Sequence, residues 1–247
     1  MPENRTPIRQ AMVLAAGLGT RLRPITDRMP KPLVPVGGRP MIDYMLDLLL
    51  GAGIQTACVN VHHFADQMEK HLAQEKRLQI ILSDERAQLL NSGGGLVQGL
   101  SLLDRQPTLV VNADLFWVNE AVGEKPALAS LSDAFDPLHM DMLLLCVPLD
   151  RTTGHNGKKD FSLGADGRLS RYREPLPSPV VYAGALAVHP DLFVDAPRDA
   201  FNLNLYFDRA IEHGRLFGLM LDADWITVGT PEAIEAAELV LAGSAER

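Results

Sequence analysis

Short apolar runs alternate with amphipathic stretches through the first 150 residues of the chain. The runs have the length and composition of buried strands and lie at 11–15, 57–61, 79–82, 108–112 and 142–147. Between them, residues 41–50 and 65–72 repeat apolar side chains at helical spacing. Strands that alternate with helices predict an α/β fold, in which helices cover a mainly parallel sheet.

The pattern changes after Leu149. Short β-like pieces follow at 161–163, 169–172 and 181–188. The chain then continues through a helix near 203–213, a strand at 216–221 and a helix that starts at Pro231. We therefore expect a flexible tail at 1–10 and one domain at 11–247. Its expected parts are a nucleotide-binding half at 11–149, a small β-rich lobe over the substrate at 150–215, and a return strand with the C-terminal helix at 216–247.

Composition narrows the class of protein. With 247 residues and 47% hydrophobic side chains, the chain can bury one substantial core. Cys58 and Cys146 lie in apolar runs without a CxxC partner, which is typical of a protein from the reducing cytoplasm. A net charge of -8 argues against a nucleic-acid binder. No run reaches the roughly 18 to 20 apolar residues of a membrane span. We expect a cytoplasmic protein without nucleic-acid or membrane partners, and the sequence leaves its oligomeric state open.

A glycine turn follows the first strand and carries the clearest chemical signal. Gly17 and Gly19 allow a sharp turn whose N–H groups can face an anion. Arg21 and Lys31 add positive charge, and residues 20–39 hold five basic side chains against one acid. In an acidic chain this local charge predicts a polyphosphate site. A plain glycine-rich turn with an arginine-covered surface is the alternative.

Two other phosphate motifs do not fit. A dinucleotide fingerprint needs a third glycine where this chain has Leu22. The Gly157-Lys158 pair is followed by Lys159 instead of the Ser or Thr of a P-loop. The sequence therefore favours neither a dinucleotide-dependent dehydrogenase nor a P-loop NTPase.

Asp114 follows the apolar run at 108–112 and should emerge at the carboxyl edge of the sheet, where open α/β sheets bind ligands. A hard oxygen ligand at that edge suits Mg²⁺ carried by phosphates. Capping of the next turn is the alternative for this aspartate. Asn112 could satisfy the strand edge or contact a sugar. The glycines at 93–95 precede a helical pattern and could let a flat base approach the backbone, or they could form a plain loop.

The motif at residues 14–36 resembles the opening of the sugar nucleotidyltransferase family. It reads Leu-Ala-Ala-Gly-x-Gly-Thr-Arg-Leu-x-Pro-x-Thr and continues as Pro-Lys-Pro-Leu-x-Pro-Val. Three later stretches follow in the family's order, at 91–95, 111–114 and 225–231. Within the family, residues 154–163 are most similar to the N-acetylmuramate 1-phosphate uridylyltransferases of cell-wall recycling.

The resemblance implies a single Rossmann-like, GT-A-like α/β domain with a mixed, mostly parallel, seven-stranded sheet. It also implies Mg²⁺ and an in-line attack by a sugar 1-phosphate on the α-phosphorus of an NTP, which releases pyrophosphate. Catalytic residues would be Arg21, Lys31 and Asp114, with Asp114 as the metal ligand. The implied nucleotide-binding residues are Leu14, Ala15, Ala16, Gly17, Gly19, Thr20, Arg21, Lys31, Glu85, Gly93 and Gly94.

For the sugar, the resemblance implies Asn112, Asp160 and Gly184. Lys158 and Lys159 could meet the lactyl carboxylate of a muramate, or they could belong to a solvated turn. We expect UTP and N-acetylmuramate 1-phosphate as substrates. The alternatives are a guanylyltransferase for mannose or heptose 1-phosphate, and a thymidylyl- or uridylyltransferase for glucose 1-phosphate.

One position departs from the family pattern. Thr227 stands where the family usually carries a second metal-binding aspartate. Asp222 and Asp224 would project from the opposite face of a regular strand. Asp114 would then be the main protein ligand of the metal. The departure also raises an alternative of another class, a catalytically silent subunit that senses nucleotides.

Overall fold

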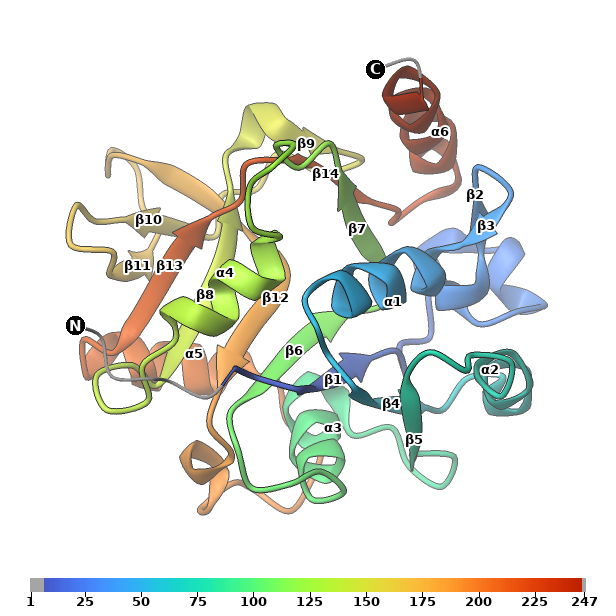
Figure 1. Cartoon of the computed structure of the whole chain (residues 1–247), viewed down its shortest axis with the longest axis horizontal. Coiled ribbons are helices and arrows are strands. Elements are labelled where there is room, and N and C mark those ends of the chain that lie inside the picture. The colour runs from blue at the N-terminus through green and yellow to red at the C-terminus, as the bar shows by residue number, and fades with distance from the viewer. Residues whose placement is uncertain (1–6, 246–247) are drawn as a thin grey trace.

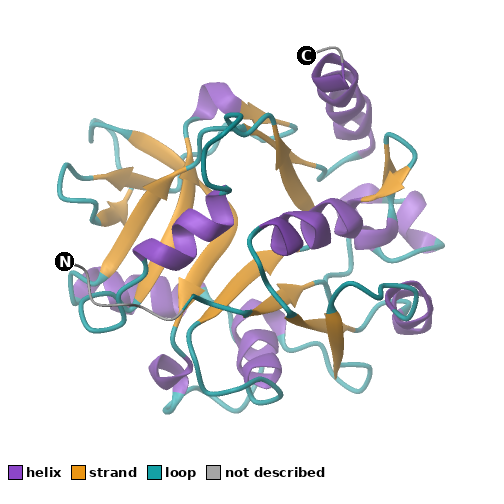
Figure 2. Ribbon diagram, viewed as in Figure 1, coloured by secondary structure: helices purple, strands orange, loops and turns teal. Residues whose placement is uncertain are grey.

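A parallel half-sheet forms the first part of the computed structural model, which describes residues 7–245 (Figures 1 and 2). Strand β1 lies between β4 and β6, and β5 pairs with the outer side of β4. All of these pairs are parallel, as the alternation of strands and helices predicts. The strands are β1 (Gln10–Leu14), β4 (Thr56–Val61), β5 (Gln79–Asp84) and β6 (Thr108–Asn112).

The second half of the sheet is largely antiparallel. Strand β12 (Pro179–Val188) runs antiparallel to β6 and to β8, and β13 closes the sheet parallel to β8. The first residues of β12 also pair with a hairpin that lies beside its amino end. The strands are β8 (Met142–Val147), β10 (Phe161–Leu163), β11 (Leu169–Arg171) and β13 (Leu216–Met220).

Within residues 7–245 the sheet has nine strands instead of the expected seven. Seven form the main sheet, and the β10–β11 hairpin adds two because β12 extends beyond β6 and offers its free edge there. The fold is otherwise the expected α/β fold with a mixed central sheet and a small β-rich lobe.

Helices cover both faces of the sheet because alternate residues of each buried strand point to opposite sides. Ala11 and Val13 pack in one apolar cluster with α1, α2 and α4, whereas Met12 packs in another with α3 and α5. The helices are α1 (Met41–Gly51), α2 (Ala65–Leu72), α3 (Asn91–Leu100), α4 (Ala127–Ala134) and α5 (Asn204–Glu212). Cys58 and Cys146 lie in β4 and β8, where both are fully buried.

A third apolar cluster lies beneath the C-terminal helix α6 (Pro231–Ala245). It includes side chains of a three-stranded sheet and of the segment that contains Lys31. The elements here are β2 (Pro35–Val36), β3 (Arg39–Pro40), β7 (Leu115–Val118), β9 (Thr152–Thr153) and β14 (Asp224–Thr227). The described part of the chain also forms short 3₁₀ turns, which are η1 (Thr20–Leu22), η2 (Ile25–Asp27), η3 (Lys31–Leu33), η4 (Leu149–Arg151) and η5 (Pro190–Phe193).

The tail expected at residues 1–10 lies partly outside the described residues. Ile8 is buried, and its N–H donates to Ser132 Oγ over 2.9 Å. Gln10 begins β1, and its amide donates to Thr108 Oγ1 over 2.7 Å. Residues 8–10 therefore belong to the folded domain, because they pack and hydrogen-bond with it.

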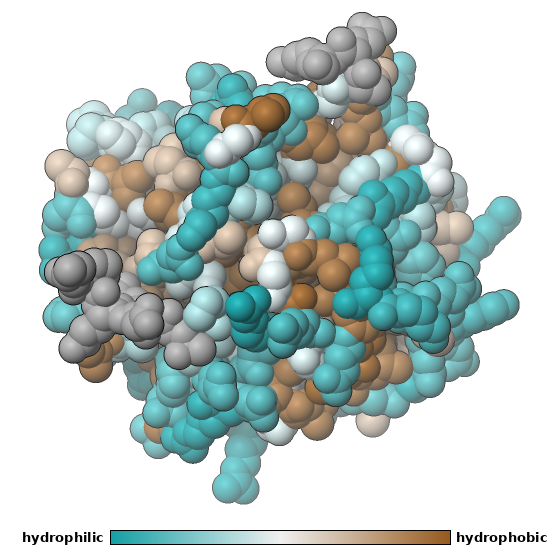
Figure 3. Space-filling model, in the orientation of Figure 1, coloured by the Kyte–Doolittle hydropathy of each residue, from teal (hydrophilic) through white to brown (hydrophobic). Residues whose placement is uncertain are grey.

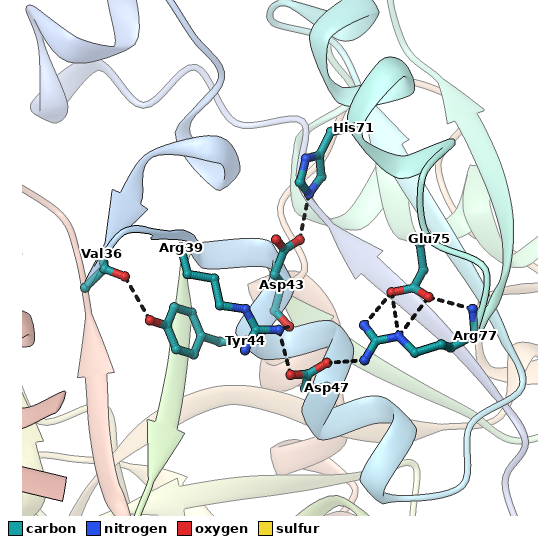
Figure 4. Close-up of polar contacts among 8 residues, drawn as sticks. All are labelled: Val36, Arg39, Asp43, Tyr44, Asp47, His71, Glu75 and Arg77. Carbon is teal, nitrogen blue, oxygen red and sulfur yellow. Dashed lines mark hydrogen bonds and ion pairs between the residues drawn. The ribbon is translucent and has the colours of Figure 1, made fainter. Parts of the chain in front are cut away.

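Hydrogen bonds and ion pairs connect α1 to the neighbouring elements (Figure 4). Asp43 of α1 accepts from His71 of α2 over 2.6 Å, and Asp47 meets both Arg39 and Arg77. Arg77 also pairs with Glu75. Hydrophilic side chains cover most of the face shown in Figure 3. Among residues 7–245, no helix is long and apolar enough to cross a membrane.

Candidate active site

The glycine turn connects β1 to η1 and packs directly on Lys31. Gly19 has a φ of 61°, and a Cβ built there would lie 2.9 Å from Lys31 Cβ and from Thr26 Cγ2. Glycine is therefore required both by the backbone conformation and by the close approach. Thr26 Oγ1 donates to the Gly19 carbonyl over 2.8 Å. At Gly17 a Cβ would meet nothing within 4 Å, so this side of the turn is open.

Asn60 holds the first part of the turn. Its Oδ1 accepts from the N–H groups of Ala15 and Ala16 over 2.6 and 3.2 Å. Its Nδ2 donates to Glu85 over 2.6 Å, and the second oxygen of Glu85 accepts from Leu90 N–H over 2.9 Å. Within the described chain, the N–H groups at 17–20 have no protein acceptor. These groups can therefore bind an anion.

Lys31 and Asp114 meet beside the turn. Lys31 Nζ lies 2.5 Å from Asp114 Oδ2, and the lysine side chain is only 9% exposed. Lys31 starts η3 between two prolines, and Asp114 lies in the connection from β6 to β7. The aspartate is thus at the carboxyl edge of the sheet, as its place after the apolar run predicts.

A cavity of about 250 Å³ brings these groups together. Its lining includes seven residues that the sequence singled out and five others. The seven are Leu14, Ala15, Ala16, Gly17, Lys31, Asn112 and Asp114, and the others are Pro32, Asn60, Leu89, Asn91 and Ser92. The turn, the charged pair and the strand ends therefore face one shared space.

Arg21 lies outside this lining. Its side chain is exposed, and its guanidinium lies 3.3 to 3.6 Å from the position of a Cβ at Gly229. Among the residues that the structure describes, no carboxylate pairs with it. Thr20, its neighbour in η1, is also exposed and outside the cavity.

Glu85, Gly93 and Gly94 also lie outside the cavity lining. Glu85 is 2% exposed, and both of its oxygens accept hydrogen bonds inside the protein, so it supports Asn60 rather than facing a ligand. A Cβ at Gly93 would lie 2.2 Å from the Phe201 ring, and one at Gly94 would lie 3.0 Å from Leu90 Cβ. The Phe201 ring and Leu90 therefore occupy the space beside these two glycines, whereas the sequence suggested that a base could approach there.

A second cavity of about 230 Å³ adjoins the first and shares Leu14, Ser92 and Asn112 with it. Asp160, expected in the sugar site, lines this cavity. The remaining lining residues are Phe161, Arg171, Tyr182, Asn202, Leu203, Asn204 and Phe207. Asp160 Oδ2 accepts from Tyr182 N–H over 2.9 Å, which fixes the carboxylate at the wall.

Gly184 does not line the second cavity but shapes the strand behind it. It has a φ of 72°, and a Cβ there would lie 2.3 Å from Leu115 and 3.2 Å from Asn112 Nδ2. It lies where the pairing of β12 with β8 shifts register, between Tyr182 and Leu186. Its contribution to the site is therefore indirect, through the position of Asn112.

The residues around Asp114 show which side chains could join it as metal ligands. Val228 N–H donates to the Asp114 carbonyl over 3.5 Å, and Thr227 pairs with Leu115. Asp222 and Asp224 instead lie 3.4 and 3.3 Å from the guanidinium of Arg151. The described residues contain no group of three His, Cys, Asp or Glu side chains placed to hold a metal. One carboxylate fits a divalent cation that also takes oxygen ligands from substrate phosphates and water.

The two cysteines do not contribute to this chemistry. Burial raises the pKa of the Cys58 thiol to about 12 and raises the pKa of Cys146 as well. Both thiols therefore stay protonated near neutral pH, which makes them poor nucleophiles and poor metal ligands.

A turn with free N–H groups beside a lysine and an aspartate suits a phosphate chain, and the joined cavity suits a hydroxyl-rich second substrate. Fold and site thus define a nucleotide-dependent transferase. The model of the nucleotidyl transferase family matches residues 10–136. This chain belongs to the nucleotidyl transferase family, whose members generally use a divalent metal.

Two relatives extend the match over nearly the whole chain. A Caulobacter vibrioides protein named N-acetylmuramate alpha-1-phosphate uridylyltransferase is 42% identical over 94% of this chain and 96% of its own length. A Neisseria meningitidis protein of the same name is 32% identical, over 95% of this chain and 99% of its own.

Solved structures show the same fold. HddC from Yersinia pseudotuberculosis, complexed with GMP-PN, superposes with a TM-score of 0.74 at 19% identity and covers 95% of this chain and 100% of its own. A UDP-glucose pyrophosphorylase complexed with UDP-glucose gives a TM-score of 0.73 at 17% identity, over 96% and 99% of the two chains.

Proposed function

We propose that the protein joins UTP and N-acetylmuramate 1-phosphate to form UDP-N-acetylmuramate and pyrophosphate. The observation that carries the reaction type is the pair of joined cavities, one lined by Lys31 and Asp114 and the other by Asp160. The substrate pair is supported by the names of the two relatives that match along nearly their whole length. The two free, buried cysteines are compatible with a reducing compartment such as the cytoplasm.

In this reaction an oxygen of the sugar phosphate attacks the α-phosphorus of UTP. A new phosphorus–oxygen bond forms, and the bond from the α-phosphorus to the bridging oxygen of pyrophosphate breaks. Positioning and charge stabilisation provide most of the catalysis in phosphoryl-type transfer. No covalent intermediate with the enzyme is needed.

Different residues of the site would bind the phosphates, the metal ion and the sugar. The free N–H groups at 17–20 would bind phosphate oxygens of the nucleotide, and the exposed guanidinium of Arg21 would add charge beside them. Lys31 would exchange its contact with Asp114 for a phosphate oxygen. This exchange leaves Asp114 as a ligand for Mg²⁺, which supplies charge neutralisation at the phosphates when bound. Asn112 and Asp160 would hold sugar hydroxyl or amide groups in the joined cavity.

The test is a turnover matrix of four NTPs against several sugar 1-phosphates, read by pyrophosphate release. UTP with N-acetylmuramate 1-phosphate should give the highest kcat/KM. A higher value for GTP with mannose 1-phosphate would make the protein a guanylyltransferase. Nucleotide binding without pyrophosphate release from any pair would instead support a silent nucleotide-sensing subunit, the alternative that Thr227 raises.

A further inference from the structure

The second cavity contains a fixed guanidinium that no role above requires. Arg171 ends β11 opposite Phe161, and its side chain is one-third exposed. Its guanidinium carbon lies 4.9 Å from the centre of the Phe161 ring and 5.9 Å from that of Phe207. Nε donates to Asp208 Oδ1 over 2.7 Å, and Nη2 donates to Asn204 Oδ1 over 2.8 Å. Aromatic rings and two acceptors on α5 therefore fix the plane of this group.

The two contacts leave most of its donors available. A guanidinium carries five N–H donors, and Arg171 uses one at Nε and one at Nη2. In the described part of the chain, no acceptor meets Nη1. Two neighbouring N–H groups held in one plane match the two oxygens of a carboxylate.

The charges that line the cavity decide whether an acidic substrate group can bind there. Asp160 also lines the cavity and would repel an acidic substrate group. Arg171 is the cationic residue in the cavity lining. Its Nε pairs with Asp208, which lies outside the lining and is 57% exposed, so solvent screens that pair and the guanidinium can still offset part of the repulsion from Asp160. Muramate differs from glucosamine in its lactyl ether, which carries a carboxylate. An acidic sugar in this cavity therefore needs a cation that a neutral sugar does not.

The two lysines that could meet the lactyl group, or could belong to a solvated turn, lie elsewhere. Lys158 and Lys159 are exposed, and neither lines the cavity. Lys159 Nζ instead lies 4.9 Å from the centre of the Tyr172 ring and 3.4 Å from its hydroxyl. Tyr182 does line the cavity, and burial raises the pKa of its hydroxyl, so this group remains a neutral hydrogen-bonding partner.

We propose that Arg171 determines specificity by binding the lactyl carboxylate of the acceptor sugar through its free guanidinium edge. This inference rests on the proposed function, because it presumes a muramate in the second cavity. It assigns the choice between acidic and neutral sugars to one residue of the β10–β11 hairpin, and it leaves the nucleotide half of the site unaffected.

The test compares N-acetylmuramate 1-phosphate with its lactyl carboxamide, which has nearly the same shape, keeps the charged 1-phosphate and has no charge on the lactyl group. At saturating UTP, the wild-type enzyme should prefer the acid by at least about tenfold in kcat/KM, as expected for a hydrogen-bonded ion pair. Arg171→Gln should bring this ratio close to one by slowing the acid and sparing the carboxamide. Arg171→Lys should give an intermediate ratio, because lysine keeps the charge but lacks the two coplanar N–H groups of the guanidinium.

Arg168→Gln is the matched control. Arg168 lies 5.2 Å over the Phe217 ring, pairs with Asp166 and lies outside the cavity, so its loss should leave the ratio at the wild-type value. The inference is wrong if Arg171→Gln slows both sugars equally, which is the result of a purely structural role. A fall in the ratio in a Lys158→Gln/Lys159→Gln double variant, with Arg171→Gln unchanged, would also overturn it.

The two proposals fail in different ways. If the wild-type enzyme turns over UTP with N-acetylmuramate 1-phosphate best but Arg171→Gln keeps the ratio, the role of Arg171 falls and the proposed function stands. If the wild-type enzyme does not use N-acetylmuramate 1-phosphate, the proposed function falls, and the role of Arg171 with it.

Discussion

Replacement of Glu85 by glutamine separates a supporting role from direct contact with the nucleotide. Both partners of the Glu85 carboxyl group are donors, the Asn60 amide and the Leu90 N–H. Asn60 cannot turn its amide around, because its oxygen already accepts from two backbone N–H groups of the glycine turn. A glutamine at position 85 offers one acceptor and one donor. At one of the two contacts its NH₂ group would therefore face another hydrogen-bond donor.

The magnitude follows from the burial of this pair. Glu85 is 2% exposed and Asn60 is 3% exposed, so water cannot replace the lost contact. One hydrogen bond to a charged group, lost with its donor left buried, lowers the free energy of unfolding by about 2 kcal/mol. For a chain of this length that corresponds to a fall in Tm of about 4 to 8 °C.

Thermal melting of Glu85→Gln and Glu69→Gln, followed by circular dichroism, measures this effect. Glu69 is the surface control: it forms an ion pair with Arg86, and its side chain is 54% exposed. Its replacement should change the free energy of unfolding by no more than about 0.5 kcal/mol. A Glu85→Gln enzyme that melts like the wild type but has a raised KM for the nucleotide would refute the supporting role and restore the expected direct contact.

Three further predictions concern the charged groups. Lys31→Ala and Arg21→Ala should each lower turnover at least about tenfold, or roughly 1.4 kcal/mol of transition-state stabilisation, and wild-type kinetics in folded variants would remove these residues from the mechanism. In a Mg²⁺ titration, Thr227→Asp should lower the concentration for half-maximal turnover, whereas Asp114→Asn should nearly abolish activity. An unchanged midpoint would contradict the first of these expectations. The side chain of Glu75 accepts from a neighbouring guanidinium (Figure 4), which lowers its pKa from 4.5 to about 2. Its stabilising effect is therefore complete above about pH 5 and is lost as the pH falls towards about 2. The gap in Tm between the wild type and Glu75→Gln should close over that range, and a constant gap would show that the contact is not electrostatic.

The sequence predicts the parts of the site that depend on local pattern. Gly19 has the positive φ that its place in the turn requires, and Asp114 lies at the strand edge that the apolar run before it indicates. Lys31 lies beside both. Each of these features follows from a strand, its end and the turn after it, which a single sequence displays.

The features that the sequence does not predict depend on contacts between distant segments. Asn60 lies 45 residues from Ala15, and the pairing of β1 with β4 brings them together. A polar residue near the end of an apolar strand was the available signal, and it is the same signal that identifies Asp114. The space beside Gly93 is filled by Phe201, which lies far away in the sequence. The position of Arg171 depends on the pairing of its hairpin with β12. No local pattern contains that information.

The register shift in β12 has a consequence for how this strand can change in length. Between Tyr182 and Leu186 the strand advances four residues while its partner in β8 advances two, from Cys146 to Leu144. Two additional residues preserve the alternation of faces, so Tyr182 and Leu186 both pack in the apolar cluster that includes α3 and α5. A single additional residue would turn Leu186 and every residue after it to the opposite face. Insertions and deletions in this strand should therefore be tolerated in pairs, and an odd change in length would exchange its two apolar faces.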